Sequence, residues 1–263
     1  MKNLFLLSFL FIGLISFAQD EENYKTVFET VEQNCDSIKN LKFCYLKRFQ
    51  LIVQKKFSEE INLNNKLSKN IGDDIYMEIE IDTTGKFIIN KLSTKSKDFE
   101  KSLNKLVESL PRIKVFENEN QKKVKLEAIL DFQLYKINFD RYIEPEGKKD
   151  LSLLEAPRFE SCRSIKDEEN SKKCLMLQMN NHIIQNFRYP TKALNKNISG
   201  RTVGAFIITK EGFVTNYIVY DADILLLKET LRILKLLPKF IPGKYNNENV
   251  AVSYAQPLKF KLN

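Results

Sequence analysis

Histidine, tryptophan and glycine are scarce in this chain. Its 263 residues include one His, no Trp and 8 Gly. A single His excludes a metal site built from two histidines, and it leaves one candidate base for a Ser or Cys nucleophile. The sequence also lacks a Gly-rich phosphate loop and a dinucleotide-binding fingerprint. We therefore expect neither an enzyme nor a bound cofactor or metal.

The single histidine, His182, falls inside a predicted helix, one residue before an apolar position. A catalytic base needs a partner nucleophile, and no motif marks one. We therefore assign His182 a surface or capping role. Asp223 directly precedes another predicted helix, and we interpret it as the residue that caps that helix.

Long hydrophobic runs are also rare, and the most apolar one lies at the N-terminus. Leu4–Phe17 is almost wholly apolar and follows the basic Lys2, while residues 16–18 place small side chains where a signal peptidase cleaves. A membrane helix needs about 20 apolar residues, so this run is short for an anchor. We predict a cleaved signal peptide at residues 1–18 and a periplasmic protein. An uncleaved anchor is the alternative.

Positive charge is in excess, with 42 Lys and Arg against 34 Asp and Glu. The excess is spread along the chain, so it describes the surface potential rather than a particular partner. Because we expect export, we predict no nucleic-acid partner. Hydrophobic residues make up 43% of the chain, which is enough for a buried core.

Only four cysteines are present, and they fall into two pairs that are close in sequence. Disulfides are the default in an oxidising compartment. Four cysteines allow three connectivities, and the spacing favours Cys35–Cys44 and Cys162–Cys174. A site with four thiolates around a metal is a weaker alternative, because neither pair has the usual C-x2-C spacing. Free buried cysteines are the other alternative.

The two halves of the chain share intervals. Phe57 follows Cys44 by 13 positions, as Phe187 follows Cys174, and Pro111 follows Gly85 by 26 positions, as Pro238 follows Gly212. The apolar patterns between these anchors also agree. We interpret the halves as two copies of one unit. The alternative is a chance similarity between two small α+β segments.

Each copy is predicted to run helix, strand, tight turn, strand, helix, loop, strand. In the second copy the first helix buries a face formed by Met176, Met179, Ile183 and Phe187. The predicted elements of this copy are a helix at 171–187, strands at 201–209 and 213–220, a helix at 224–237 and a strand at 249–262. The predicted last strand of the first copy covers 123–135.

A series of short motifs in the second copy resembles a known family. They are Tyr189-Pro190, Gly200-Arg201-x-Val203, Gly212-x-Val214 and Pro238-x-x-x-Pro242-Gly243. Residues 159–263 in this order resemble the C-terminal domain of the TonB energy transducer of Gram-negative bacteria. The first copy departs from the pattern, because Ser58-Glu59 stands where Tyr-Pro is expected and Asp73-Asp74 where Gly-Arg is expected. We interpret it as a diverged copy.

The resemblance implies an α+β fold with two tandem TonB C-terminal-like domains. Each would have a helix and a three-stranded antiparallel sheet with a second helix packed on one face. The predicted organisation is a signal peptide at 1–18, a diverged domain at 19–137, a linker at 138–157 and a second domain at 158–263.

The resemblance also implies a binding role. TonB domains hold a short extended peptide of an outer-membrane transporter by adding it to an open sheet edge. In this chain the implied edge is the last strand, with Val250, Val252 and Tyr254, and Tyr189-Pro190 would lie nearby. The expected partner is a TonB-dependent outer-membrane transporter or another cell-envelope protein. The alternative is a structural or adaptor protein that scaffolds an envelope complex or self-associates as a homodimer.

Overall fold

The computed structural model describes residues 42–50, 52–53, 74–94, 97–113, 116–117, 121–133, 142–143 and 154–262. The predicted signal peptide and Cys35 lie outside these ranges. The chain divides into two compact units, one of residues 1–71, 80–90 and 94–126, the other of residues 72–79, 91–93 and 127–263. Within the described ranges, none of the helices is both long and apolar enough to cross a membrane.

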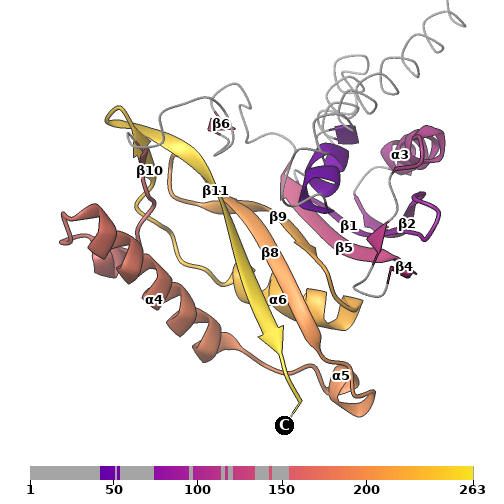
Figure 1. The fold of residues 1–263 in the computed structure, drawn as a ribbon. Coiled ribbons are helices and arrows are strands. Elements are labelled where there is room, and N and C mark those ends of the chain that lie inside the picture. Colours follow the sequence, from indigo (N-terminus) through magenta and orange to yellow (C-terminus); the bar gives the residue numbers. More distant parts are fainter. Residues whose placement is uncertain are drawn as a thin grey trace, which may run out of the picture. The chain divides into compact units, whose positions relative to one another are not determined.

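Helices separate groups of consecutive strands, and the strands pair mainly in antiparallel direction, as in an α+β fold (Figure 1). The first half contains residues 42–50 and 52–53 in helical conformation, then β1 (Asp74–Ile81), β2 (Phe87–Ser93), α3 (Lys97–Ser109), β3 (Phe116–Glu117), β4 (Lys123–Val124) and β5 (Leu126–Gln133). The second half contains β6 (Tyr142–Ile143), β7 (Leu154–Glu155), η4 (Glu160–Cys162), α4 (Glu168–Asn186), α5 (Thr191–Asn195), β8 (Gly200–Ile208), β9 (Val214–Tyr220), α6 (Ile224–Lys235), β10 (Gly243–Tyr245) and β11 (Glu248–Phe260).

One sheet contains nine of the described strands. Their order is β2, β1, β5, β9, β8, β11, β10 and β7, with β6 beside β11. The sequence predicts separate three-stranded sheets, whereas here β5 pairs with β9 in antiparallel register from Ala128↔Tyr220 to Asp131↔Tyr217. Both strands are apolar, and Ile129 and Val219 are fully buried. Pairing removes two open edges that would otherwise expose unpaired backbone groups.

Helices α4 and α6 contribute to the main core of the second unit. On β8, Gly204 has no side chain, and a Cβ there would lie 2.3 Å from Leu234 Cδ1 of α6. The missing side chain therefore lets α6 approach the strand closely. The hydroxyls of Thr202 on β8 and Thr230 on α6 lie 2.8 Å apart and are buried. The core side chains of this cluster include Leu175, Met179, Phe206, Ile208, Tyr217, Val219, Leu227, Leu231 and Leu234.

Helix α4 begins three residues earlier than predicted, because Asp167 caps it by accepting a hydrogen bond from Asn170 N at 2.8 Å. The predicted buried face is wrong at Met176, which is 60% exposed, and Leu175 occupies the core instead. It is also wrong at Phe187, which is 36% exposed and follows the last residue of the helix. The helix has apolar residues on two sides, so spacing alone could not select the correct face. His182 Nε2 donates to the Ile233 carbonyl in the last turn of α6 at 3.0 Å, which agrees with the capping alternative of the expected surface or capping role.

The cysteines follow the local pairing where the structure describes it. Cys162 and Cys174 form a disulfide, which ties η4 to the second turn of α4. This part of the prediction is confirmed. Cys44 is also disulfide-bonded. Its expected partner Cys35 lies outside the described ranges, so that pairing stays a prediction.

The two hairpin turns have the same geometry in both halves. Gly85 has φ +81° and Gly212 has φ +87°, which is the left-handed conformation that favours glycine. The carbonyl of Gly85 accepts from Ile113 N at 2.9 Å, and the carbonyl of Gly212 accepts from Phe240 N at 2.8 Å. In both halves the residue that binds the glycine lies 28 positions after it and two positions after a proline.

Candidate functional site

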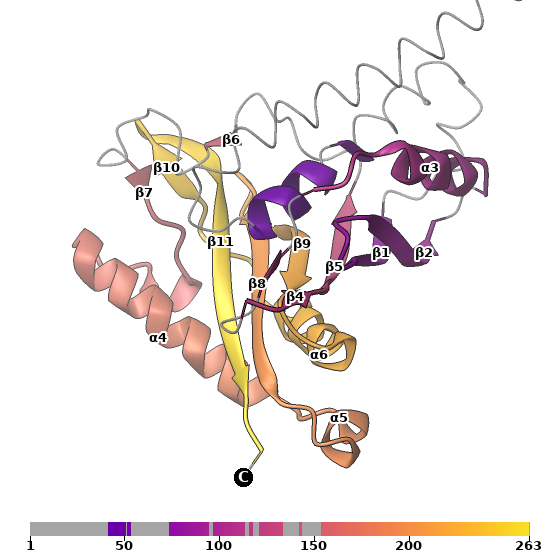
Figure 2. The same ribbon diagram turned by 45° about the vertical axis from the view of Figure 1, so that its right-hand side comes forward.

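The last strand, β11, has one edge paired and the other edge partly paired. Its inner edge pairs with β8 from Val252↔Ile208 to Phe260↔Gly200 (Figure 2). On its outer edge, β10 pairs with residues 248–250 and β6 pairs with Ala251 and Val252. The edge at Val250 and Val252 is therefore not bare, in contrast to the expectation. Within the part of the chain that the structure describes, residues 253–260 have no strand on this side.

Pro257 shows which backbone groups face the open edge. It stands opposite Val203 inside the β8 ladder, yet it has no N–H to donate. A proline is accommodated in such a strand when its nitrogen faces away from the neighbouring strand. Alternate residues of a strand point their N–H and C=O groups to the same edge. The groups of Ser253, Ala255 and Lys259 therefore face outward.

The open edge is interrupted at its proline. Pro257 offers no donor, and its carbonyl already accepts a hydrogen bond from the Gln256 side-chain amide at 3.1 Å. An added strand can thus form its regular ladder with Ser253 and Ala255, and again with Lys259. The candidate site is a short edge of backbone groups rather than a cavity.

Two of the predicted site residues pack within the sheet. Val252 is only 8% exposed and stands opposite Ile208 of the core. The ring of Tyr254 packs against Phe206, with 5.6 Å between the centroids, and burial raises the pKa of its hydroxyl. Both side chains hold β11 on β8, so they would affect binding through the position of the strand.

Tyr189 lies at the opposite end of β11 from Val250 and Val252. Its ring stands edge-on to Phe260 at 5.8 Å, and its hydroxyl donates to the Ile198 carbonyl at 2.7 Å. A strand rises about 3.3 Å per residue, so Phe260 is about 20 Å from Tyr254. The structure therefore brings Tyr189 to one end of the open edge and does not bring the five predicted residues together.

Pro190 fixes the path of the chain after Tyr189. It is the N-cap residue of α5, and its carbonyl accepts from Ala193 N at 2.9 Å and Leu194 N at 3.0 Å. Phe187, next to this turn, packs on Phe260 with 5.1 Å between ring centroids. The Tyr-Pro pair thus marks an aromatic cluster, Phe187, Tyr189 and Phe260, at the C-terminal end of the edge.

Glu229 of α6 is a positioning residue that sequence reasoning missed. It is only 8% exposed, and its carboxylate accepts from Arg188 N at 2.8 Å. Arg232 donates to the same carboxylate at 2.7 and 2.8 Å and also to the Asn186 carbonyl. The hydrogen bond to Glu229 raises the pKa of Arg232. The i,i+3 spacing of Glu229 and Arg232 could have been found in the sequence, whereas their bonds to residues 186 and 188 could not.

A polar pocket lies between β5, β9 and the end of α6. Lys235 Nζ is 2.6 Å from Asp131 Oδ2, and Tyr76 and Tyr217 line the same pocket. Burial and then the charge of Asp131 raise the pKa of Tyr217. Each of these side chains has a partner inside the protein, since Tyr76 donates to Glu78 and Tyr217 donates to the Val214 carbonyl. The pocket is therefore part of the packing around the β5–β9 junction.

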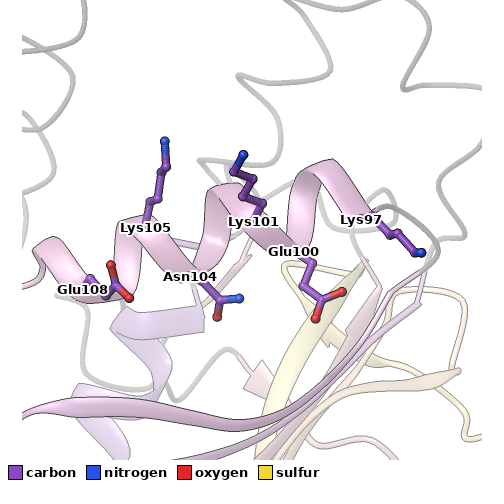
Figure 3. A pocket seen from close by; sticks show the side chains of 6 residues that line it. All are labelled: Lys97, Glu100, Lys101, Asn104, Lys105 and Glu108. Carbon is purple, nitrogen blue, oxygen red and sulfur yellow. The ribbon is translucent and has the colours of Figure 1, made fainter.

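Helix α3 of the first half presents a mixed charged surface. Figure 3 shows that Lys101 and Lys105 point to one side of α3, whereas Glu100 and Asn104 point to the other. The residues are Lys97, Glu100, Lys101, Asn104, Lys105 and Glu108. This agrees with a solvated helix face. In the described ranges no group of three or more His, Cys, Asp or Glu side chains could hold a metal ion.

Comparisons with known proteins agree with the motif pattern. Residues 185–262 match the family model described as "Gram-negative bacterial TonB protein C-terminal". One solution structure of the Helicobacter pylori TonB C-terminal domain is 20% identical, covers 39% of this chain and 90% of its own, and has a TM-score of 0.28. Another structure of that domain is 25% identical, covers 33% and 91%, and has a TM-score of 0.24. No curated protein matches the sequence. From the family match, we conclude that residues 185–262 form a TonB C-terminal-like domain.

Proposed function

We propose that this protein binds an extended peptide of a TonB-dependent outer-membrane transporter in the periplasm, by strand addition to the open edge of β11. The observation that carries the proposal is the outer edge of residues 253–260, which no described strand pairs, in a TonB C-terminal-like domain. Such an edge offers N–H and C=O groups that an extended chain satisfies. The protein would act as a binding module and not as an enzyme.

Two short strands that already occupy the same edge support this mode of binding. β10 covers the strand up to Val250, and β6 adds in parallel at Ala251 and Val252. The edge of β11 is thus compatible with added strands of either direction. A peptide would continue the row from Ser253 toward the aromatic cluster at Phe260.

The strength of this binding follows from the number of backbone groups. Ser253, Ala255 and Lys259 each offer a donor and an acceptor, and each hydrogen bond is worth about 0.5–1.5 kcal/mol net. Ordering the peptide opposes this gain. We therefore expect modest affinity, with specificity supplied by side chains next to the edge, Tyr189 among them.

We further propose that the first half is a diverged copy within the tandem arrangement, with domains at 19–137 and 158–263 and a linker at 138–157. Support comes from the strand order, because β2-β1-β5 repeats as β9-β8-β11. The glycine turns at Gly85 and Gly212 add to it, since both are anchored in the same way. The strand that corresponds to β11 is β5, and its outer edge pairs with β9. Only the second copy would therefore bind a peptide.

The proposal is tested by removing one outward N–H. Ala255→Pro deletes this donor while its nitrogen, like that of Pro257, points away from β8. We expect labelled transporter plug peptides to bind the wild-type protein and to bind Ala255→Pro about 5- to 10-fold more weakly, the equivalent of one hydrogen bond. Ala255→Ser keeps the N–H and should bind like the wild type in the same fluorescence anisotropy titration.

Two outcomes would contradict the proposal. If the wild-type protein binds no plug peptide, the scaffold or adaptor alternative takes its place. If Ala255→Pro and Ala255→Ser bind equally well, a peptide is bound elsewhere and the edge of β11 is not the site.

A further inference from the structure

Helix α4 has a second apolar stripe that faces solvent. Leu175 and Met179 are buried against the core, as expected for a helix on a sheet. On the other side, Met176 is 60% exposed, Leu177 57% and Ile184 74%. In Figures 1 and 2, α4 lies at the outside of its unit, with no other described element on the side of the helix away from the sheet. Three large apolar side chains on one outer face are more than isolated surface residues.

This stripe belongs to the longest uncharged run among the described residues. Residues 174–187 contain no Asp, Glu, Lys or Arg, although charged residues make up 29% of the chain. A surface helix ordinarily carries charges on the side away from the core. Charged side chains resume on both sides of the run, at Lys173 and Arg188. From Cys174 to the end of α4, the absence of charge therefore extends to the outer face of the helix as well as its inner face.

The stripe is symmetric about its centre. Leu177 and Ile184 are seven residues apart, so they lie almost in line on the helix. Asn180 and Asn181 stand midway between them, one on each side of that line, and both are exposed. If the helix is paired with itself in antiparallel direction, Leu177 meets Ile184 at both ends and the two Asn pairs meet at the axis. Paired amides in such a seam fix its register.

We propose that the occupant of this stripe is α4 of a second copy of the chain, packed antiparallel about a two-fold axis. A two-fold interface must be complementary to itself, and residues 174–186 of α4 meet this condition without placing like charges opposite each other. This matters because each chain carries a net charge of +8 and repels a second copy elsewhere. Lys173, one turn before Leu177, forms an ion pair with Glu169 of its own helix at 2.7 Å. The antiparallel direction also opposes the two helix dipoles favourably.

The size of the stripe sets the strength of the dimer. An interface made by a few side chains of one helix buries only a small surface area. Interfaces that bury less than roughly 1,200 Å² are weak or transient. We therefore expect a dissociation constant of about 10 μM to 1 mM. The pairing uses α4 and leaves the open edge of β11 unused, so it does not depend on peptide binding.

Charge-swap variants test both the site and the direction of pairing. Analytical ultracentrifugation of the purified full-length protein, in the form that the expressing cell produces, should show a monomer–dimer equilibrium. Leu177→Lys alone and Ile184→Glu alone should each weaken self-association at least 10-fold, because each places a charge in both halves of the seam. An equimolar mixture of the two variants should recover association. In the mixed dimer the introduced lysine faces the introduced glutamate at one end, and the unchanged Ile184 faces the unchanged Leu177 at the other.

An exposed apolar residue outside α4 provides the control. Leu236, at the end of α6, is 50% exposed, and Leu236→Lys should leave the equilibrium unchanged. All these positions are on the surface, and circular dichroism would confirm that each variant is folded. A wild-type chain that stays monomeric at 1 mM overturns the proposal. So does self-association that Leu177→Lys and Ile184→Glu do not weaken, and a mixture that fails to associate overturns the antiparallel pairing.

Discussion

The hairpin turn at Gly212 gives a quantitative test of the fold. Its φ is +87°, and a Cβ added there would lie 1.9 Å from the Phe240 carbonyl oxygen. Gly212→Ala therefore meets two separate penalties, one from the conformation of its own backbone and one from a collision with the backbone of the anchoring loop. The change adds a single methyl group and alters no charge.

The magnitude follows from these two terms. A non-glycine residue in the left-handed region costs about 1–2 kcal/mol. Relief of the collision moves the Phe240 backbone, which lengthens the 2.8 Å hydrogen bond from Phe240 N to the Gly212 carbonyl and costs about 0.5–1.5 kcal/mol. The lower chain entropy of the unfolded alanine variant returns about 0.4–1 kcal/mol. We expect a net loss of about 2 kcal/mol.

Urea unfolding followed by circular dichroism measures this loss. With an m-value of about 1.5 kcal/mol/M, the midpoint should fall by more than 1 M. Gly200→Ala is the matched control, because a Cβ there has Leu226 Cδ1 as its nearest neighbour at 3.6 Å, an ordinary contact. It should change the free energy of unfolding by less than about 1 kcal/mol.

The corresponding turn of the first half extends the test. A Cβ at Gly85 would lie 2.0 Å from the Ile113 carbonyl oxygen, so Gly85→Ala should cost a similar amount. If Gly212→Ala destabilises no more than Gly200→Ala, the reasoning from the left-handed turn and its anchor is refuted. A clear difference between Gly85→Ala and Gly212→Ala would argue against equivalent turns.

Three further predictions concern the cross-link, a buried carboxylate and alkaline pH. Removing the Cys162–Cys174 disulfide, by changing both residues to Ser, should lower the free energy of unfolding by about 3 kcal/mol for a loop of this length, as thermal or urea unfolding under oxidising conditions would show; no change would contradict a stabilising cross-link. Glu229→Gln should cost about 1 kcal/mol, since Arg232 is partly exposed, and should speed amide exchange at Arg188 measured by NMR; unchanged exchange would refute its positioning role. The raised pKa of Tyr217 means that its stabilising contribution is lost as the pH rises above about 10, the pKa of an unfolded tyrosine, so Tyr217→Phe should make the fall in stability above that pH less steep; an unchanged slope would contradict this.

Local features of the second half could be predicted because each depends on residues close in sequence. Gly212 marks its turn, and Asp223 caps α6 by accepting from Leu225 N at 2.8 Å, as expected. Helix α6 ends before Pro238, and Cys162 and Cys174 pair within twelve residues. Short-range periodicity, capping and spacing carry this information directly.

The features that could not be predicted depend on contacts distant in sequence. The pairing of β5 with β9 joins two edges that look equally apolar in isolation. The pairing of β10 and β6 with β11 near Val250 and Val252 likewise depends on the path of other segments, and the sequence of β11 alone does not reveal it. At α4 the difficulty was different, because apolar residues on both sides left Leu175 and Met176 equally suited to the core.

The order of the elements along the chain bears on how the second unit assembles. As the protein is synthesised from its N-terminus, Cys162 and Cys174 come together early, since only a short segment separates them. The edge of strand β8 stays unpaired until β11 is made, because the paired residues are up to sixty positions apart in sequence. Contacts of such long range form slowly, and the waiting edge of β8 is open to other strands meanwhile. The cross-linked helix can thus form before the sheet that it covers is complete. Pairing of β11 with β8 then closes the edge at which other strands could add.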